Sequence, residues 1–202
     1  AFCGARVEPG WRFCPECGRA QDAPPPVARE EKPARPIPET LATRIRASQA
    51  VAGERKRATV FFCDLVDSTA LAERLDPEVY RELLDRYLEL AFAEIYRFEG
   101  IVNQLAGDGL MALFGAPIAH EDAPERAVRA ALAIQASLAD LSDRLLAERG
   151  VSLRARIGIH TGIVVAGTVG NDQKMDYTAI GDTTNLAARL QSLATPGTIL
   201  IS

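Results

Sequence analysis

The sequence has few cysteines, little net charge and no long hydrophobic run, and each absence excludes a class of protein. Four cysteines among 202 residues are too few for a disulfide scaffold. A net charge of −4 does not suit a strongly basic nucleic-acid binder, so nucleic acid is not an expected partner. Apolar runs such as residues 58–63 are far shorter than the roughly 20 residues that span a bilayer. The first residues are polar, unlike a signal peptide, so we expect a cytoplasmic protein with no membrane partner.

What is present is the composition of a globular protein, divided into three zones. Hydrophobic residues make up 48% of the chain and charged residues 25%. Residues 1–19 contain most of the cysteines, and residues 20–53 are rich in proline, which favours an extended linker. A short helix is expected within that linker, over residues 39–52. Residues 54–202 are apolar and periodic, so they must form the main core.

The cysteine zone predicts a small metal-binding segment. Cys14 and Cys17 form a C-x₂-C knuckle, and Cys3 resembles the second half of another knuckle. Together they resemble a truncated zinc ribbon, so we expect Cys3, Cys14 and Cys17 to bind a structural Zn²⁺ in a site that is incomplete within this chain. A ribbon that docks nucleic acid or protein is an alternative role. Cys63 lies in an apolar segment and is expected to be a free, buried cysteine.

The main zone predicts an α+β fold of ferredoxin-like βαββαβ order with an extension. Asp76 and Pro77 favour a helix start, and Asp122 with Glu125 resembles a capping box. Gly107 and Asp108 predict a hairpin turn, and a second turn is expected at residues 161–162. We expect strands at residues 59–66, 101–106, 110–114, 151–160, 163–169 and 198–201, and helices from residue 77, from residue 122 and over 182–194.

Two carboxylates in this zone are candidates for a metal site. Asp64 lies within an apolar strand, where an unpaired charge is very unfavourable, and its alternative role is to cap a helix near Ser68. Asp108 lies in the hairpin turn, where aspartate is also ordinary turn chemistry. If the hairpin lies beside the first strand, both carboxylates enter one mouth and can hold Mg²⁺ together with phosphate oxygens. The free amides of the helix start that follows would bind phosphate. The candidate phosphate-binding residues are Val66, Asp67, Ser68 and Thr69.

A second candidate pair lies on the last predicted helix. Asn185 and Arg189 are four residues apart and share one helix face. An amide beside a guanidinium suits a sugar and a phosphate, although a solvated polar face has the same pattern. His160 is expected to be structural on a core strand, and His120 to be a polar residue before a helix.

Four segments together resemble the catalytic domain of class III nucleotide cyclases, in particular a bacterial subgroup similar to soluble cyclase. The resemblance covers about residues 55–202, and four separate motifs in the same order make it specific. The motifs are ATVFFCDLVDST (58–69), GDGLMALFG (107–115), GIHTG (158–162) and YTAIGDTTNLAARL (177–190).

The resemblance implies a ferredoxin-like catalytic domain that acts as a head-to-tail homodimer with active sites between the subunits. Asp64 and Asp108 match the two metal-binding aspartates, and the Leu65 carbonyl matches an additional ligand of the two Mg²⁺ or Mn²⁺ ions. Asn185 and Arg189 match residues that the other subunit contributes. Asn185 would orient the ribose, and Arg189 would stabilise charge on the α-phosphate.

The base-selecting positions depart from the usual sets of this family. Gln104 stands where adenylyl cyclases usually have lysine, and Thr178 at the second position resembles the bacterial subgroup. The resemblance implies conversion of ATP to 3′,5′-cyclic AMP, with GTP as the alternative substrate. A non-catalytic nucleotide-sensing or dimerisation module is the alternative function. The family's phosphate-binding lysine would follow Ser202, so we expect a C-terminally incomplete domain, with ATPase and repeat domains beyond it.

Overall fold

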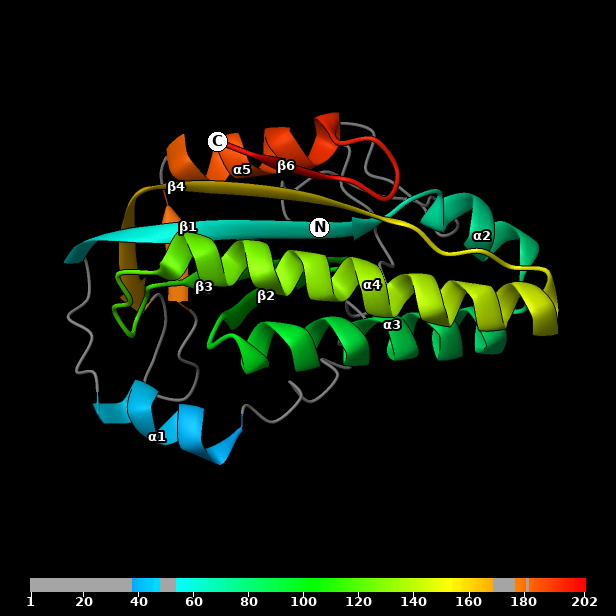
Figure 1. The fold of residues 1–202 in the computed structure, drawn as a ribbon, viewed down its shortest axis with the longest axis horizontal. Helices are drawn as coiled ribbons and strands as arrows, with labels where there is room; N and C mark the ends of the chain where they lie inside the picture. Colours follow the sequence, from blue (N-terminus) through cyan, green and yellow to red (C-terminus); the bar gives the residue numbers. More distant parts are fainter. Residues whose placement is uncertain (1–37, 48–53, 169–176, 181) are drawn as a thin grey trace, which may run out of the picture. The chain divides into compact units, whose positions relative to one another are not determined.

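Figure 1 shows the chain as a computed structural model, which describes residues 38–47, 54–168, 177–180 and 182–202. These residues belong to one compact unit that runs from Ile37 to Ser202. The predicted zinc ligands lie outside the described residues, as does the proline-rich linker before residue 38. None of the helices in the described part is long and apolar enough to span a membrane.

A six-stranded sheet forms the centre of the unit. Its order is β2-β3-β1-β4-β5, with antiparallel neighbours, and β6 pairs in parallel with β4. This mixed α+β arrangement agrees with the predicted class. The strands are β1 (Glu54–Leu65), β2 (Ile101–Ala106), β3 (Gly109–Phe114), β4 (Ala155–Thr168), β5 (Tyr177–Ile180) and β6 (Ile199–Ile201).

Helices cover both faces of the sheet, because β1 is apolar on both of its sides. Phe61 and Cys63 pack with the buried residues of α3 and α4, which lie next to each other (Figure 1). Ala58 and Val60 pack on the other face with Ala187 of α5. The helices are α1 (Glu39–Ala47), α2 (Ser68–Arg74), α3 (Pro77–Arg97), α4 (Ala123–Arg149) and α5 (Asp182–Leu193). The predicted helix start at Pro77 and the turn at residues 107–108 are therefore confirmed.

Cys63 is a free, buried cysteine, as predicted. Its Sγ atom lies 3.1 Å from the hydroxyl of Tyr87, which is also fully buried. Burial raises the pKa of the Cys63 thiol to about 12, so it remains protonated at neutral pH.

The short helix α1 is attached to the start of β2. Leu41 is buried against Ile101, and Arg44 forms an ion pair with Glu99. Glu99 also contacts His120, whose Nε2 atom lies 2.9 Å from its carboxylate. His120 is thus one of the residues that converge on Glu99, a more specific role than the predicted polarity before α4.

Strand β4 corrects the prediction of two strands joined by a turn at residues 161–162. It is one continuous strand, and Gly162 has a different function there. A Cβ atom at Gly162 would lie 2.5 Å from Oγ1 of Thr183 on α5. At Gly158 it would lie 2.2 Å from the amide nitrogen of Gln191. Both glycines allow α5 to lie directly on β4.

The predicted capping box at the start of α4 is also wrong. Asp122 accepts a hydrogen bond of 2.7 Å from Arg126, and Glu125 accepts one of 2.6 Å from Arg129. Asp122 makes no side-chain cap bond. Each acidic side chain instead pairs with an arginine four residues later along the exposed helix surface.

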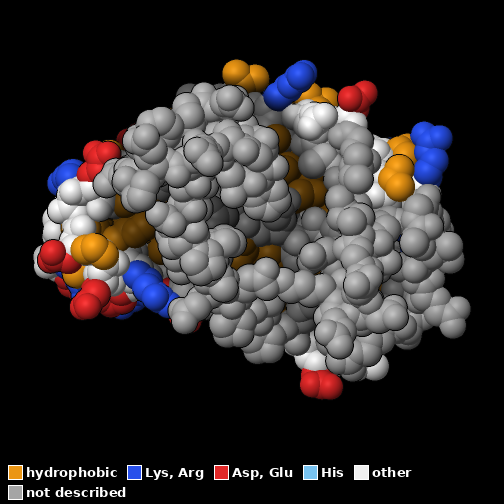
Figure 2. Space-filling view, turned by 180° about the vertical axis from the view of Figure 1, so that it is seen from behind, with side chains coloured by type: hydrophobic (Ala, Val, Ile, Leu, Met, Phe, Trp, Pro, Cys, Tyr) orange, Lys and Arg blue, Asp and Glu red, His pale blue; other side chains and the backbone are white. Residues whose placement is uncertain are grey.

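The described surface mixes charges of both signs. Figure 2 shows acidic and basic side chains interspersed on the face opposite to that in Figure 1, wherever described residues are visible. The visible described side chains form no extended basic patch, which is in keeping with the overall charge of −4.

Candidate active site

Asp64 and Asp108 meet at one end of the sheet. Asp64 is the second-last residue of β1, and Asp108 lies in the turn between β2 and β3. Because β3 pairs with β1 and Leu110 is opposite Cys63, the turn lies beside the end of β1. The two carboxyl groups are in direct contact. The structure therefore brings both carboxylates together in one pocket.

The two carboxyl groups differ in their partners. Oδ2 of Asp64 accepts hydrogen bonds from Nη2 of Arg156 and Nε2 of Gln191, each 3.4 Å long. Oδ2 of Asp108 is buried and has no hydrogen-bond partner. Asp64 thus does not cap a helix, and the residue before α2 is Asp67 in a left-handed conformation. The alternative role of Asp64 as a cap is wrong because Arg156 and Gln191 bind its carboxylate.

The pKa of Asp64 is raised from 3.8 to about 6, chiefly by burial of its side chain and also by the neighbouring Asp108. Arg156 opposes the shift by stabilising the ionised carboxylate. Two adjacent carboxyl groups, one with an unpartnered buried oxygen, repel each other when both are ionised, and a positive charge between them would offset that repulsion. A divalent cation would provide that charge.

The donor set suits a hard cation that is completed by a substrate. The described residues contain no group of three or more histidine, cysteine, aspartate or glutamate side chains arranged for a metal ion. Asp64, Asp108 and Leu65 line the same pocket, so the two carboxylates and a backbone carbonyl such as that of Leu65 could hold such a cation. Mg²⁺ is commonly held by one or two carboxylates together with substrate phosphates.

An open pocket of about 550 Å³ extends from the two carboxylates to the start of α2. The backbone amides of the first turn of a helix have no partner within the helix, so Ser68 and Thr69 present donors to this pocket. Val66 does not, because its amide donates to the carbonyl of Arg154 at 2.8 Å. The lining residues are Asp64, Leu65, Asp67, Ser68, Thr69, Ala70, Glu73, Asp108 and Arg156.

Arg156 is a site residue that the sequence argument missed. It lies on β4 directly opposite Asp64 of β1, and its guanidinium lines the pocket. Its Nε atom is buried without a partner. Like Asp64, Arg156 is a charged residue within an apolar strand, and that sequence signal could have identified it. A guanidinium beside carboxylates at a helix start is suited to phosphate.

A second pocket, of about 290 Å³, lies on the other side of Asp64. Gln104 of β2 lines it, together with Gln191 of α5 and apolar side chains such as Phe62 and Met111. Thr178, the other predicted base-selecting residue, lies on β5 opposite Gly167 of β4. The structure thus places Gln104 in a pocket with Asp64, whereas the side chain of Thr178 lies outside the described part of the chain.

Asn185 and Arg189 lie apart from the two carboxylates of their own chain. Both are exposed on α5, whose buried residues Thr183 and Ala187 face the sheet. Neither lines either pocket. Their shared face is available to another molecule, which fits both a solvated surface and a role in a second subunit's site.

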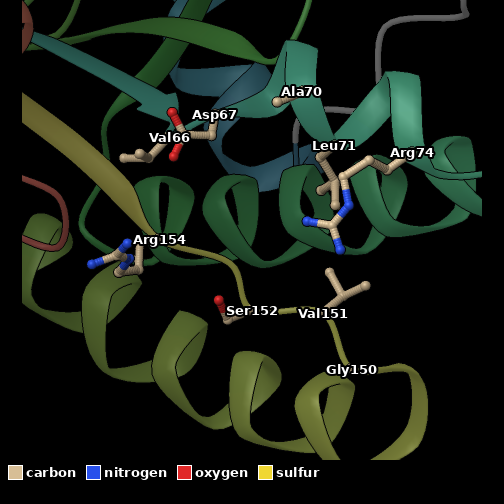
Figure 3. Close-up of a pocket in the computed structure, with 9 residues that line it drawn as sticks. All are labelled: Val66, Asp67, Ala70, Leu71, Arg74, Gly150, Val151, Ser152 and Arg154. Carbon is tan, nitrogen blue, oxygen red and sulfur yellow. The ribbon is translucent and has the colours of Figure 1, made fainter.

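A third cavity, of about 250 Å³, lies on the other side of α2, between this helix and the connection from α4 to β4 (Figure 3). Asp67 and Ala70 line both this cavity and the 550 Å³ pocket. Arg74 extends from α2 toward Ser152 in this view. Helix α2 thus has a pocket on each of two sides.

The adenylate and guanylate cyclase catalytic domain family matches residues 51–202, and the chain belongs to this family. Adenylate cyclase 1 of Rhizobium meliloti is 35% identical over 139 residues, which cover 69% of this chain and 21% of that protein. An uncharacterised protein of Mycobacterium tuberculosis is 37% identical over 156 residues, which cover 77% and 28%. The chain thus spans less than a third of the length of these relatives.

Solved structures of adenylyl cyclases and of guanylyl cyclases share the fold of this chain. The adenylyl cyclase CyaB from P. aeruginosa has a TM-score of 0.70 at 36% identity, covering 74% of this chain and 78% of that one. The guanylyl cyclase Cya2 has a TM-score of 0.70 at 33% identity, covering 75% and 77%. The guanylate cyclase domain of RhGC from Catenaria anguillulae, in complex with GTP, has a TM-score of 0.65 at 29% identity, covering 74% and 80%. The predicted cyclase fold is confirmed.

Replacing Asp64 by asparagine is expected to stabilise the metal-free protein. The folded-state pKa of Asp64, about 6, exceeds its ordinary value of 3.8, so its ionised form destabilises the fold. This penalty is absent below pH 3.8 and develops as the pH rises through 6. Because the side chain of Asp64 is 31% exposed and solvent screens part of the effect, we expect about 1 kcal/mol, or a melting temperature higher by about 2–4 °C at pH 7.5.

Thermal melts in a metal chelator, at pH 5 and pH 7.5, measure this effect. The advantage of Asp64→Asn should be smaller at pH 5. Glu73→Gln is the matched control, because Glu73 is an exposed carboxylate that lines the same pocket. An Asp64→Asn protein that melts below the wild type at pH 7.5 would contradict the prediction.

Proposed function

We propose that this chain is the catalytic domain of a purine nucleotide cyclase that converts ATP into 3′,5′-cyclic AMP and pyrophosphate. The observation that carries the proposal is the pair of contacting carboxylates, one with an unpartnered buried oxygen, in a pocket with Arg156 and the start of α2. Membership of the cyclase family supports it, as does the likeness to the adenylyl cyclase CyaB.

In this reaction the ribose 3′-oxygen attacks the α-phosphorus, and the bond from the α-phosphorus to the bridging oxygen of the β-phosphate breaks. Pyrophosphate leaves, and the proton of the 3′-hydroxyl passes to solvent. Asp64 and Asp108, with the Leu65 carbonyl, would hold two Mg²⁺ or Mn²⁺ ions, whose positive charge would favour deprotonation of the hydroxyl and neutralise the triphosphate. The attack is intramolecular, so correct positioning by the protein supplies much of the rate.

Residues around the larger pocket would bind the triphosphate. The guanidinium of Arg156 provides charge-assisted hydrogen bonds to phosphate oxygens. The amides of Ser68 and Thr69 at the start of α2 add neutral donors. When phosphates draw Arg156 away from Asp64, that carboxylate is released to a cation.

The remaining groups would come from a second copy of the chain, in a head-to-tail homodimer. Asn185 would orient the ribose, and Arg189 would stabilise charge that develops on the α-phosphate. Their exposure on the outer face of α5, outside both pockets of their own chain, supports this arrangement.

ATP is the proposed substrate, with GTP as the alternative. The amide of Gln104 can both donate and accept hydrogen bonds, so it can bind a purine edge. Gln104 lines the pocket beside Asp64. The relatives do not separate the nucleotides, since one solved relative is an adenylyl cyclase at 36% identity and another a guanylyl cyclase at 33%.

The test is to incubate the full-length protein with Mn²⁺ and either ATP or GTP, and to quantify both cyclic nucleotides. We expect more cyclic AMP from ATP than cyclic GMP from GTP at equal substrate concentrations. More cyclic GMP than cyclic AMP would reverse the substrate assignment. A folded protein that binds ATP but forms neither product would refute catalysis and support a nucleotide-sensing module.

A further inference from the structure

Gln191 contacts the site but has no role in the function proposed above. It lies in the last turn of α5, on the side that faces the sheet. Its Nε2 atom donates to Oδ2 of Asp64 at 3.4 Å. It also lines the 290 Å³ pocket with Asp64 and Gln104. This side chain is the direct link from α5 to the carboxylate pair.

The backbone of Gln191 is fixed against β4. A Cβ atom at Gly158 would lie 2.2 Å from the amide nitrogen of Gln191 and 2.4 Å from the carbonyl of Ala187. The main chains of α5 and β4 are therefore in contact with no side chain between them. Gly158 pairs with Phe62 of β1, two residues before Asp64. The amide of Gln191 thus extends from a rigid base close to Asp64.

The donors around Asp64 fix which oxygen faces which way. Arg156 and Gln191 both donate to Oδ2. Oδ1 lies on the side of the hairpin that carries Asp108, because it is 3.5 Å from the place of a Cβ atom at Gly109. One oxygen is thereby held by donors, and the other is directed to the neighbouring carboxyl group.

We propose that Gln191 is a positioning residue that orients the carboxylate of Asp64 for cation binding. The inference rests on the proposed function, in which Arg156 turns to the phosphates of the nucleotide. Gln191 is then the donor that remains on Oδ2. Its amide is neutral, so it orients the carboxylate without opposing the cation. Hydrogen bonds that orient metal ligands typically change metal affinity by about 10–100-fold when removed.

The test uses Gln191→Met in the full-length protein, because methionine has a similar length and no N–H donor. Electron paramagnetic resonance of free Mn²⁺ measures the Kd without nucleotide. We expect a Kd roughly tenfold higher than that of the wild type. In the cyclase assay, the half-saturating Mn²⁺ concentration should rise similarly, while kcat at saturating Mn²⁺ changes less than about twofold.

Ser192→Ala is the matched control. Ser192 is the next residue on α5, is exposed, and its hydroxyl bonds to the carbonyl of Ala188 within the same helix. It should leave both the Kd for Mn²⁺ and the melting temperature unchanged. Gln191→Ala, which favours the helix and also lacks the donor, serves if the methionine variant is unstable.

The outcomes separate this inference from the proposed function. A wild type that binds Mn²⁺ no more tightly than Asp108→Ala would refute the metal site itself. A wild type that binds Mn²⁺ through Asp108, with an unchanged Kd in Gln191→Met, would refute only the role of Gln191. A raised Kd with an unchanged melting temperature would support it, because a merely structural residue would change the melting temperature instead.

Discussion

Alanine in place of Asp108 is expected to abolish cyclisation, with a loss of roughly a thousandfold or more, because a metal site supplies several kcal/mol to such a transition state. Asp108 interacts with the Asp64 carboxyl group, and its buried Oδ2 atom has no hydrogen-bond partner. Without it, a single carboxylate remains for two cations. The measurement is cyclic AMP formed per active site with Mn²⁺ and ATP.

The same variant should remain folded, which separates loss of chemistry from loss of structure. Removing Asp108 relieves contact between like charges at Asp64, so the melting temperature should equal or exceed that of the wild type. Asp140→Asn is a suitable control, since Asp140 is an exposed carboxylate on α4. Retention of more than about a tenth of the activity in Asp108→Ala would contradict two-metal catalysis at this site.

The second large effect concerns restoration of activity by mixing inactive chains. Asp108→Ala and Arg189→Ala should each be inactive alone, and their mixture should recover activity. In a head-to-tail dimer, each site takes Asp108 from one chain and Arg189 from the other. When the two variants pair, one site therefore contains both substitutions and the other site contains neither. Half of randomly formed dimers are mixed, so we expect about a quarter of the wild-type activity.

A pair of variants on the same side of the interface provides the control. Asp64→Ala mixed with Asp108→Ala should recover no activity, because every site contains at least one damaged carboxylate. Native mass spectrometry of the mixtures shows whether the chains exchange. Exchange without recovery in the Asp108→Ala and Arg189→Ala mixture would place Arg189 outside the partner's site.

The features that the sequence predicted well are those encoded by neighbouring residues. Asp76 followed by Pro77 marks the start of α3, and the two residues at 107–108 form the predicted turn. The meeting of Asp64 with Asp108 could also be inferred, because it requires only that one hairpin pair with the adjacent strand. Local pattern plus one strand pairing was sufficient there.

The features that the sequence did not predict depend on distant parts of the chain. The two donors to Asp64 are 92 and 127 residues away, so no spacing indicates them. Gly162 has the composition of a turn, and only the approach of α5 reveals its actual function. The capping pattern at Asp122 fits the local rule, but Arg126 competes for the same carboxylate and binds it.

The glycine contacts between α5 and β4 bear on how the domain can diverge in evolution. Because Gly158 puts the main chains of β4 and α5 in direct contact, the distance between them at that point depends on no interposed side chain. Exchanges of side chains elsewhere in the core can therefore occur without changing that distance. Backbone contact thus sets how far the outer face of α5, with Asn185 and Arg189, lies from the carboxylates of the same chain. One added methyl group at Gly158 would alter it more than many exchanges in the core.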